Sequence, residues 1–246
     1  MHHFFIPAKN IKDGKAELPA ETANQIRKVL RLKDGQTICL LDNSGSAYEA
    51  EIEYSGDKSI CGHILQSYPV ETEPKCFLTV YLALTRREKF EWMLQKCTEA
   101  GASAFVPVFS ERSLVRNDKD IFSKIPRWQK IIQEAAEQSG RGIIPKLHDP
   151  AAFSDAVQNN ITDQCRLFFW EEEHHLTLQE ALKPVKAGLT SASLIVGPEG
   201  GFSAGEAGSA AVHGWLAVTL GKRIFRVETA AIASVILTLY ELERID

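Results

Sequence analysis

The sequence lacks the features that mark several large classes of protein. It has five cysteines in 246 residues, an odd number with wide spacing and no C-x-x-C pair, so neither a disulfide framework nor a zinc knuckle is expected. We expect reduced thiols, most of them buried. The longest apolar run, roughly residues 230–240, is too short to cross a bilayer, and the N-terminus has no signal-peptide hydrophobic region. These absences favour a cytoplasmic protein with no membrane partner.

A functional metal is not expected either. The run Glu-Glu-Glu-His-His at 171–175 contains metal-ligating residue types, but it is acidic and follows an apolar segment as a loop would. It has no pair of histidines four residues apart on a helix, the spacing that many zinc sites use.

Net positive charge is also missing, because 28 lysines and arginines are outnumbered by 32 aspartates and glutamates, a formal net charge of -4. This balance excludes a uniformly basic coat for nucleic acid. The basic residues are nevertheless clustered, at 27–33, 86–89 and 112–130. One such cluster alone is more often a solvated face than a binding site, but three of them keep a local basic surface in consideration.

The composition of the chain changes at 68–75, where Tyr-Pro-Val-Glu-Thr-Glu-Pro-Lys has two prolines and few apolar side chains to bury, as a linker between domains would. We therefore predict two domains, at 1–70 and 76–246. With 44% hydrophobic residues, the chain can bury one good core and a second, smaller one.

The two parts differ in their patterns. Short apolar or alternating runs at 4–6, 37–41, 47–54 and 59–66, separated by Asp-Gly, Ser-Gly and Gly-Asp turns, predict a small β-barrel or sandwich with one helix near 21–30. The later strands, at 77–84, 104–109, 143–146, 166–170, 193–197 and 215–220, alternate with helices, which predicts an α/β domain on a mostly parallel sheet. In the last helix we expect Ile232, Val235, Ile236 and Leu239 on one side.

Two segments near the C-terminus carry the strongest signal, LIVGPEGGFS at 194–203 and LGKRIFRVETA at 220–230. Each begins as an apolar strand and breaks at glycine, which leaves backbone N–H and C=O groups free beside a helix start. The first lacks the Lys-Ser/Thr of a P-loop and the dinucleotide spacing, so neither a nucleoside triphosphate nor NAD is favoured. The glycines could also simply permit tight turns, and Glu228 and Thr229 suit a helix start as dipole partner and cap.

Together these two segments resemble the RsmE family, which are 16S ribosomal RNA (uridine N3) methyltransferases of the SPOUT class. Ser-Glu-Arg-Ser at 110–113, Glu-Ala-Ala-Glu-Gln-Ser-Gly-Arg at 134–141 and Val-Leu-Arg-Leu-Lys at 29–33 are similar to the same family, in the family's order. The resemblance therefore covers essentially the whole chain.

The resemblance implies an N-terminal PUA-like β-barrel that binds RNA and a C-terminal SPOUT-type α/β domain with a trefoil knot. It also implies a homodimer and a molecule of S-adenosylmethionine held by main-chain groups. Glycine would allow the close approach that such binding needs. The positions carried over as cofactor contacts are Gly197, Glu199, Gly200, Gly201, Leu220, Gly221, Ile224, Phe225 and Arg226.

Methylation at N3 of uridine removes a proton from an imide, so negative charge develops over N3 and the flanking carbonyl oxygens. Arg141 and Arg226 are the candidates to stabilise this charge, and Glu137 or Glu228 is the candidate proton acceptor. The alternative for both arginines is an ion pair in the dimer interface.

The implied partner is 16S rRNA or the small ribosomal subunit, and the target base must leave its stack. Phosphate contacts are predicted for Arg27, Lys28, Arg31 and Lys33. The chain departs from the family at His2 and His3, where a basic residue is usual, and at Phe225, where leucine is usual but another apolar side chain suffices. Two alternatives remain: a SPOUT methyltransferase acting on another RNA or on ribose O2′, and a catalytically silent RNA-binding module.

Overall fold

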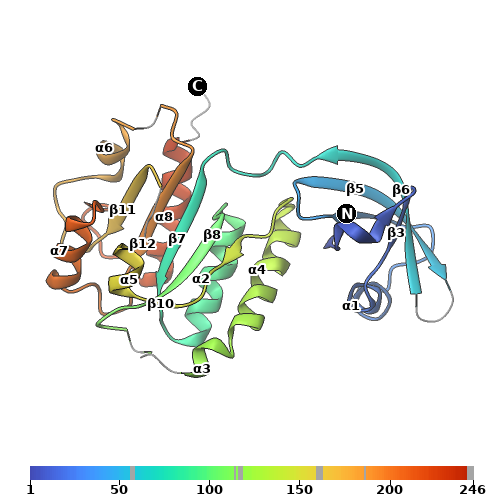
Figure 1. Ribbon diagram of the computed structural model, residues 1–246, viewed down its shortest axis with the longest axis horizontal. Helices are drawn as coiled ribbons and strands as arrows, with labels where there is room; N and C mark the ends of the chain where they lie inside the picture. The colour runs from blue at the N-terminus through green and yellow to red at the C-terminus, as the bar shows by residue number, and fades with distance from the viewer. Residues whose placement is uncertain (56–58, 114, 116–118, 159–162, 186, 243–246) are drawn as a thin grey trace. The chain divides into compact units, whose positions relative to one another are not determined.

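The computed structural model describes residues 1–55, 59–113, 115, 119–158, 163–185 and 187–242. It divides into two compact units (Figure 1). The first comprises Met1–Glu73 with Gln133–Ile144, and the second comprises Pro74–Ile132 with Pro145–Asp246. Residues 133–144, which fall inside the predicted range 76–246, are thus grouped with the first unit. The domain ranges 1–70 and 76–246 stay a prediction.

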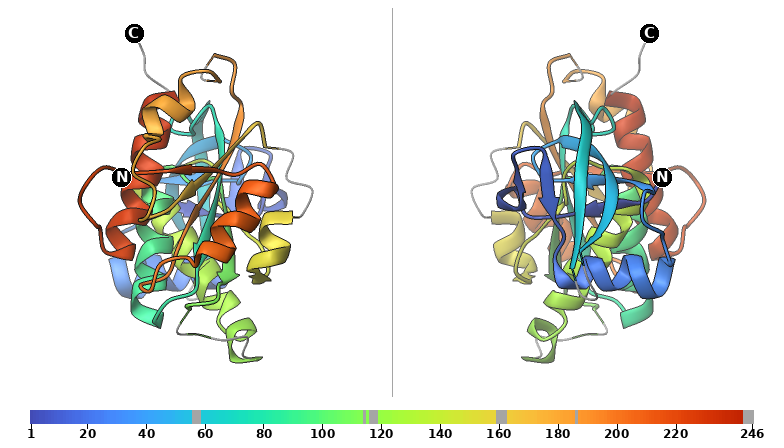
Figure 2. Two further views of the ribbon diagram at one scale, coloured as in Figure 1. Left: turned by 90° about the vertical axis from the view of Figure 1, so that its left-hand side faces the viewer. Right: turned by 90° about the vertical axis from the view of Figure 1, so that its right-hand side faces the viewer.

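The first unit is a six-stranded sheet in the order β1-β4-β5-β6-β3-β2 (Figure 2, right). Its strands are β1 (His3–Phe5), β2 (Ile11–Lys12), β3 (Lys15–Glu17), β4 (Thr37–Leu41), β5 (Ser46–Ser55) and β6 (Ser59–Pro69). All described pairs are antiparallel except β1 with β4. Alternate side chains such as Ala50 and Ile52 turn into a core closed by Ile26, and all three are at most 1% exposed.

The first unit also contains two helical segments. A 3-10 turn covers Ala8–Asn10, and α1 (Ala20–Asn24) continues as a π-helix over Gln25–Leu30. The π-helix ends at Arg31, whose φ of 54° is left-handed. Part of α4, from Gln133 onward, also belongs to this unit, and its Ala136 is fully buried against Phe5 and Leu41.

The second unit is a parallel sheet in the order β10-β8-β7-β12-β11-β13, with β9 beside β8. Its strands are β7 (Phe77–Ala83), β8 (Ala104–Phe109), β9 (Lys146–Leu147), β10 (Ala151–Ala152), β11 (Cys165–Phe169), β12 (Ser191–Val196) and β13 (Leu216–Val218). Its central strands are mostly apolar, as buried parallel strands are, and β12 is buried from Ala192 to Val196. The predicted α/β class with a mostly parallel sheet is confirmed, as is the β-rich N-terminal unit.

Helices cover both faces of this sheet (Figure 2, left). The described helices from Arg87 onward are α2 (Arg87–Glu99), α3 (Lys119–Phe122), α4 (Ile125–Ser139), α5 (Phe153–Gln158), α6 (Leu178–Leu182), α7 (Ala204–Val212) and α8 (Val227–Leu242). α2, α6 and α8 pack together on one face, and α5 and α7 on the other. None of the helices in the described part of the chain is long and apolar enough to cross a membrane.

Two predictions of detail are wrong. The strand expected at 143–146 is β9, at Lys146–Leu147. The face expected for the last helix is offset, because Val235 and Leu239 are buried but Ile236 is 49% exposed. The inner face of α8 instead includes Ala231, Ser234 and Thr238. Burial of Ser234 is compensated within the helix, because its Oγ donates to the carbonyls of Ala230 and Ala231. Four of the five cysteines are buried and all are free thiols, as predicted.

Candidate functional site

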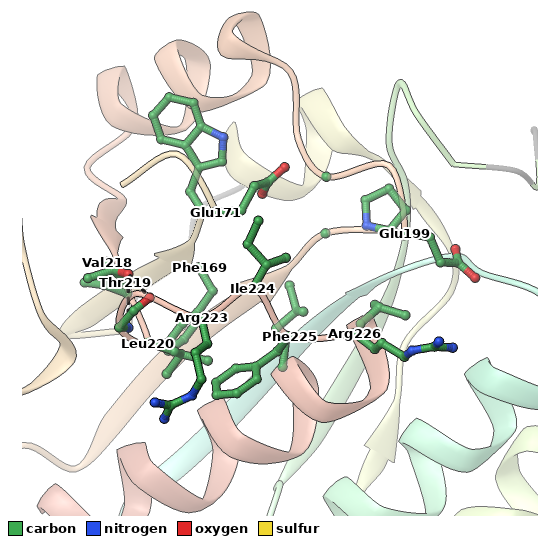
Figure 3. A pocket seen from close by; sticks show the side chains of 18 of the residues that line it. Phe169, Glu171, Glu199, Val218, Thr219, Leu220, Arg223, Ile224, Phe225 and Arg226 are labelled. Carbon is green, nitrogen blue, oxygen red and sulfur yellow. Dashed lines mark hydrogen bonds between the residues drawn. The ribbon is translucent and has the colours of Figure 1, made fainter. Parts of the chain in front are cut away.

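A cavity of about 600 Å³ opens where β11, β12 and β13 end (Figure 3). These three strands are neighbours in the sheet and run parallel, so the loops after their carboxyl ends meet at one edge. The loop after β12 is the first glycine segment, and the loop after β13 is the second. The sheet therefore joins two segments that the sequence separates.

All nine residues predicted to contact a cofactor line this cavity. They are Gly197, Glu199, Gly200, Gly201, Leu220, Gly221, Ile224, Phe225 and Arg226. Their role in binding stays a prediction, but their convergence is a property of the fold. The apolar part of the wall is completed by side chains at the strand ends, Phe169, Val196 and Val218.

The glycines of the first segment lie close to neighbouring side chains. Gly201 has a φ of 67°, and a Cβ there would lie 1.5 Å from Oε1 of Glu171. A Cβ on Gly197 would come within 3.1 Å of the Phe202 ring. The left-handed backbone therefore favours glycine at Gly201, and a Cβ there would also require the Glu171 carboxylate to move.

The second glycine segment is held at its start by Thr219. The hydroxyl of Thr219 accepts a hydrogen bond from the Gly221 N–H at 3.1 Å, where the chain turns with a φ of 105°. Beyond the turn, Ile224 is 85% exposed, and Figure 3 shows Arg223 and Arg226 extending from this segment in opposite directions. The segment presents both apolar and cationic groups to one cavity.

Lys89, near the start of α2, links the two segments electrostatically. Its Nζ lies 3.2 Å from Glu199 and 3.5 Å from Glu228, so one ammonium faces a carboxylate of each segment. The other oxygen of Glu228, Oε2, is buried and has no hydrogen-bond partner among the described residues. Sequence reasoning missed Lys89, because nothing in a basic cluster at a helix start distinguishes a cavity residue from a solvated one.

The loop after β11 supplies a third wall that sequence reasoning also missed. Trp170, Glu171 and His174 all line the cavity, although the run 171–175 reads as an ordinary acidic loop. Figure 3 shows Glu171 on this wall, above Ile224. Among the described residues, no group of three or more His, Cys, Asp or Glu is arranged to hold a metal ion.

The four predicted catalytic residues are divided between the units. Arg226 lines the cavity and Glu228 faces Lys89, both in the second unit. Arg141 belongs to the first unit, where it is 3% exposed and its guanidinium bonds to Glu73 at 2.7 Å and 3.3 Å. This ion pair stabilises the turn after α4, because Glu73 also accepts the N–H groups of Gly142 and Ile143.

Glu137, the fourth, likewise lies in the first unit. Its Oε1 accepts hydrogen bonds from the Phe5 N–H and the Gln133 side chain, both at 3.0 Å. Burial raises the pKa of the Glu137 carboxyl above its ordinary value. These contacts anchor α4 to β1, and a catalytic role for Arg141 or Glu137 stays a prediction.

The predicted RNA contacts lie at the end of the π-helix. Lys28, Arg31 and Lys33 are exposed. Arg27 is half-buried, with its guanidinium 4.9 Å from the centre of the Tyr54 ring. Of the third basic cluster, Arg116 lies outside the described residues.

Both parts of the chain match known protein families. The family described as RNA methyltransferase domain matches residues 72–239, and the family described as RNA methyltransferase PUA domain matches residues 18–65. Ribosomal RNA small subunit methyltransferase E of Bacillus subtilis is 32% identical over 234 residues, covering 92% of this chain and 90% of that protein. The protein of the same name from Synechocystis is 28% identical, covering 93% and 74%.

Solved structures agree. A ribosomal RNA small subunit methyltransferase E from Neisseria gonorrhoeae, bound to S-adenosylmethionine, superposes with a TM-score of 0.85 at 29% identity, covering 96% of this chain and 95% of that one. A putative methyltransferase from Legionella pneumophila, also in complex with S-adenosylmethionine, gives 0.86 at 28% identity, covering 97% and 96%. The protein therefore belongs to the RsmE family of RNA methyltransferases.

Proposed function

We propose that this protein transfers the methyl group of S-adenosylmethionine to N3 of a uridine in 16S rRNA of the small ribosomal subunit. The observation that carries the proposal is the cavity at the ends of β11, β12 and β13, which gathers all nine residues that the family resemblance assigns to the cofactor. The names of the relatives and the cofactor in two similar structures support it.

The cavity fits this cofactor in size and chemistry. Its 600 Å³ lies within the usual range for small-molecule sites. Main-chain groups beside Gly197, Gly201 and Gly221 can meet an adenine edge, and the apolar side chains Ile224 and Phe225 can cover its faces. Glu171, Glu199 and Lys89 supply the charges that a zwitterionic amino-acid tail requires. When bound, the cofactor supplies an electrophilic methyl group.

Within this proposal, Arg226 stabilises the uridine anion and Glu228 is the proton acceptor. Arg226 reaches the cavity, and the unpartnered Oε2 of Glu228 has a free acceptor position beside the same helix start. Lys89 holds Glu228 through its other oxygen. Arg141 and Glu137 remain proposed contributors from the first unit, besides their structural contacts there.

We propose the domain ranges 1–70 for RNA binding and 76–246 for methyl transfer, the latter with the trefoil knot of its family. Lys28, Arg31 and Lys33 are exposed and can meet phosphates, with Arg27 beside them. We propose further that the protein is a cytoplasmic homodimer. Exposed apolar residues on α8 and on the loop before it, Ile224, Ile236, Leu237 and Tyr240, support an interface there.

Nucleoside mass spectrometry of small-subunit rRNA from cells lacking the protein tests the proposal. Loss of N3-methyluridine, restored by the wild-type gene, is the expected result. Loss of a ribose-methylated nucleoside instead would favour the ribose O2′ alternative, and an unchanged profile would favour either a silent RNA-binding module or another RNA target. Purified protein incubated with small subunits and labelled cofactor then separates these last two.

The anion-stabilising role of Arg226 is tested by single-turnover methyl transfer with cofactor saturating. We expect Arg226→Ala to lower the rate about 100-fold, because a cation near the developing oxyanion is worth that much in comparable sites. Arg226→Lys, which keeps the charge, should lose less. If Arg226→Ala and Arg141→Ala both keep the full rate, neither arginine stabilises the anion.

A further inference from the structure

The segment after β8, residues 110–113, is fastened to the first glycine segment by side chains far apart in the sequence. Ser203 Oγ donates a hydrogen bond to Glu111 Oε2 at 2.6 Å, and Arg112 Nη1 donates to the Gly200 carbonyl at 3.1 Å. The Glu111 N–H donates to Oε1 of Glu206 at 2.9 Å. Three bonds therefore join this segment to the stretch from Gly200 to Glu206.

Glu206 takes part in hydrogen bonds with both Glu111 and Ser203. It is 7% exposed. Its Oε2 accepts the Ser203 N–H at 2.9 Å, and its own backbone N–H donates to Ser203 Oγ at 3.2 Å. This is a capping box at the start of α7. One carboxylate oxygen thus caps the helix and the other holds the segment after β8, so the two oxygens serve two different parts of the chain.

The capped end lies directly beside the cavity wall. Ser203 follows Gly201 and Phe202, and Phe202 is fully buried against the position of Gly197. The start of the wall is fixed by β12, and Gly201 N–H donates to the Pro198 carbonyl at 2.9 Å within it. Both ends of the glycine loop are therefore held by hydrogen bonds or by the sheet, which restricts where its main-chain groups point.

We propose that Glu206 is a positioning residue for the cofactor: it holds the wall formed by residues 197–201 through Ser203 and Glu111, without touching the ligand. The inference rests on the proposed function of the cavity. Positioning of this kind changes how well the ligand is bound, rather than the chemistry once it is bound.

Glu206→Gln tests it, because a carboxamide has a single acceptor oxygen and leaves either the Ser203 N–H or the Glu111 N–H without a partner. We expect the dissociation constant for S-adenosylmethionine, measured by calorimetry, to rise about tenfold, as the loss of one buried hydrogen bond would cause. The KM for the cofactor should rise by a similar factor, with kcat at saturation unchanged.

Glu180→Gln is the matched control. Glu180 forms the same capping box with Thr177 at α6, and its described hydrogen bonds all go to Thr177, which does not line the cavity. If Glu206→Gln does not fold, Ser203→Ala replaces it, since it removes the donor to Glu111 and one half of the cap.

Three outcomes decide the matter. Tenfold weaker binding by Glu206→Gln, with Glu180→Gln unchanged, supports the inference. Equal affinities of wild type and Glu206→Gln, even with a lower Tm for the variant, overturn it and leave the proposed function standing. Absence of binding by the wild-type protein overturns both.

Discussion

At the scale of single residues, the cavity depends on glycines whose backbone or surroundings disfavour a side chain. Gly201 combines a left-handed φ of 67° with the Glu171 carboxylate on the side where a Cβ would stand. Gly221 has a φ of 105° but open space around it. Among the glycines that line the cavity, Gly201 is the one where a left-handed backbone and a close contact coincide, so it should be the most sensitive of them.

We expect Gly201→Ala to weaken binding of S-adenosylmethionine more than tenfold in calorimetry, because Glu171 must leave the cavity wall. The left-handed backbone should also cost about 1–2 kcal/mol of unfolding free energy. Gly188→Ala is the control, since Gly188 has a φ of 84° with no atom within 4 Å of the added Cβ. It should show the stability loss alone, and equal cofactor affinity in both variants would contradict this account.

Some residues of the cavity could be predicted from the sequence and others could not. The nine predicted cofactor contacts were carried over from the family that the two glycine segments resemble, and each of these segments follows a strand. Lys89 and Glu171 could not be predicted, because they reach the cavity from α2 and from the loop after β11, and only the tertiary fold brings them there. The ion pair between Arg141 and Glu73 could not be predicted from the sequence either, because 68 residues separate the two partners.

At the scale of elements, α2 and α4 are joined by one apolar and one ionic contact. The Phe90 and Trp128 rings lie 4.6 Å apart, and Glu91 receives two hydrogen bonds from Arg127, at 2.6 Å and 2.8 Å. A further bond comes from Arg87 at 3.0 Å. The hydrogen bonds from Arg127 lower the pKa of the Glu91 carboxyl below its ordinary value.

This lowered pKa predicts a pH dependence. A carboxylate with a depressed folded-state pKa stabilises the fold above its unfolded value, near 4.5, and that contribution is lost as the pH falls through the folded pKa. We expect Glu91→Gln to reduce the free energy of unfolding by roughly 1 kcal/mol at pH 7, a modest amount because Arg127 is half-exposed. In urea titrations the difference from the wild type should shrink below pH 4.5. A difference independent of pH would rule out the ionic contribution.

The elements also show which patterns a sequence can reveal. Long buried strands such as β7, β8 and β12 were predicted because apolar runs of six or seven residues stand out. The two- and three-residue strands β2, β3, β9 and β10 are too short to show a period. The face of α8 was misjudged because small and polar residues, Ser234 and Thr238, lie on its inner side while Ile236 lies outside. Apolar spacing alone therefore could not identify the buried side.

At the scale of the whole molecule, a net charge of -4 must be reconciled with an RNA substrate. The proposed solution is local, with exposed cations at the end of the π-helix in the first unit. Binding through phosphates releases counterions, so the affinity falls as salt rises, with a slope set by the number of contacts.

We expect the double variant Lys28→Ala/Lys33→Ala to weaken binding of an rRNA fragment and to reduce the slope of log K against log salt by about 2, one for each lost contact. Lys12→Ala/Lys15→Ala removes the same charge from exposed positions of β2 and β3 and should leave the slope unchanged. Fluorescence anisotropy between 50 and 200 mM salt, roughly the range over which such slopes are read, provides the measurement. Equal slopes for the two double variants would show that the cluster is only a solvated face.

The last whole-molecule prediction concerns association. On α8, Ile236 is 49% exposed, Leu237 41% and Tyr240 59%, and positions three and four apart on a helix are neighbours. We propose that a second copy of the chain covers this apolar stripe. We expect the wild type to sediment as a dimer and Ile236→Glu to sediment as a folded monomer, because a buried unpaired carboxylate opposes the interface. Val212→Glu introduces the same charge at an 84% exposed position of α7 and should remain dimeric. A wild-type monomer, or a dimer that survives Ile236→Glu, would place any interface elsewhere.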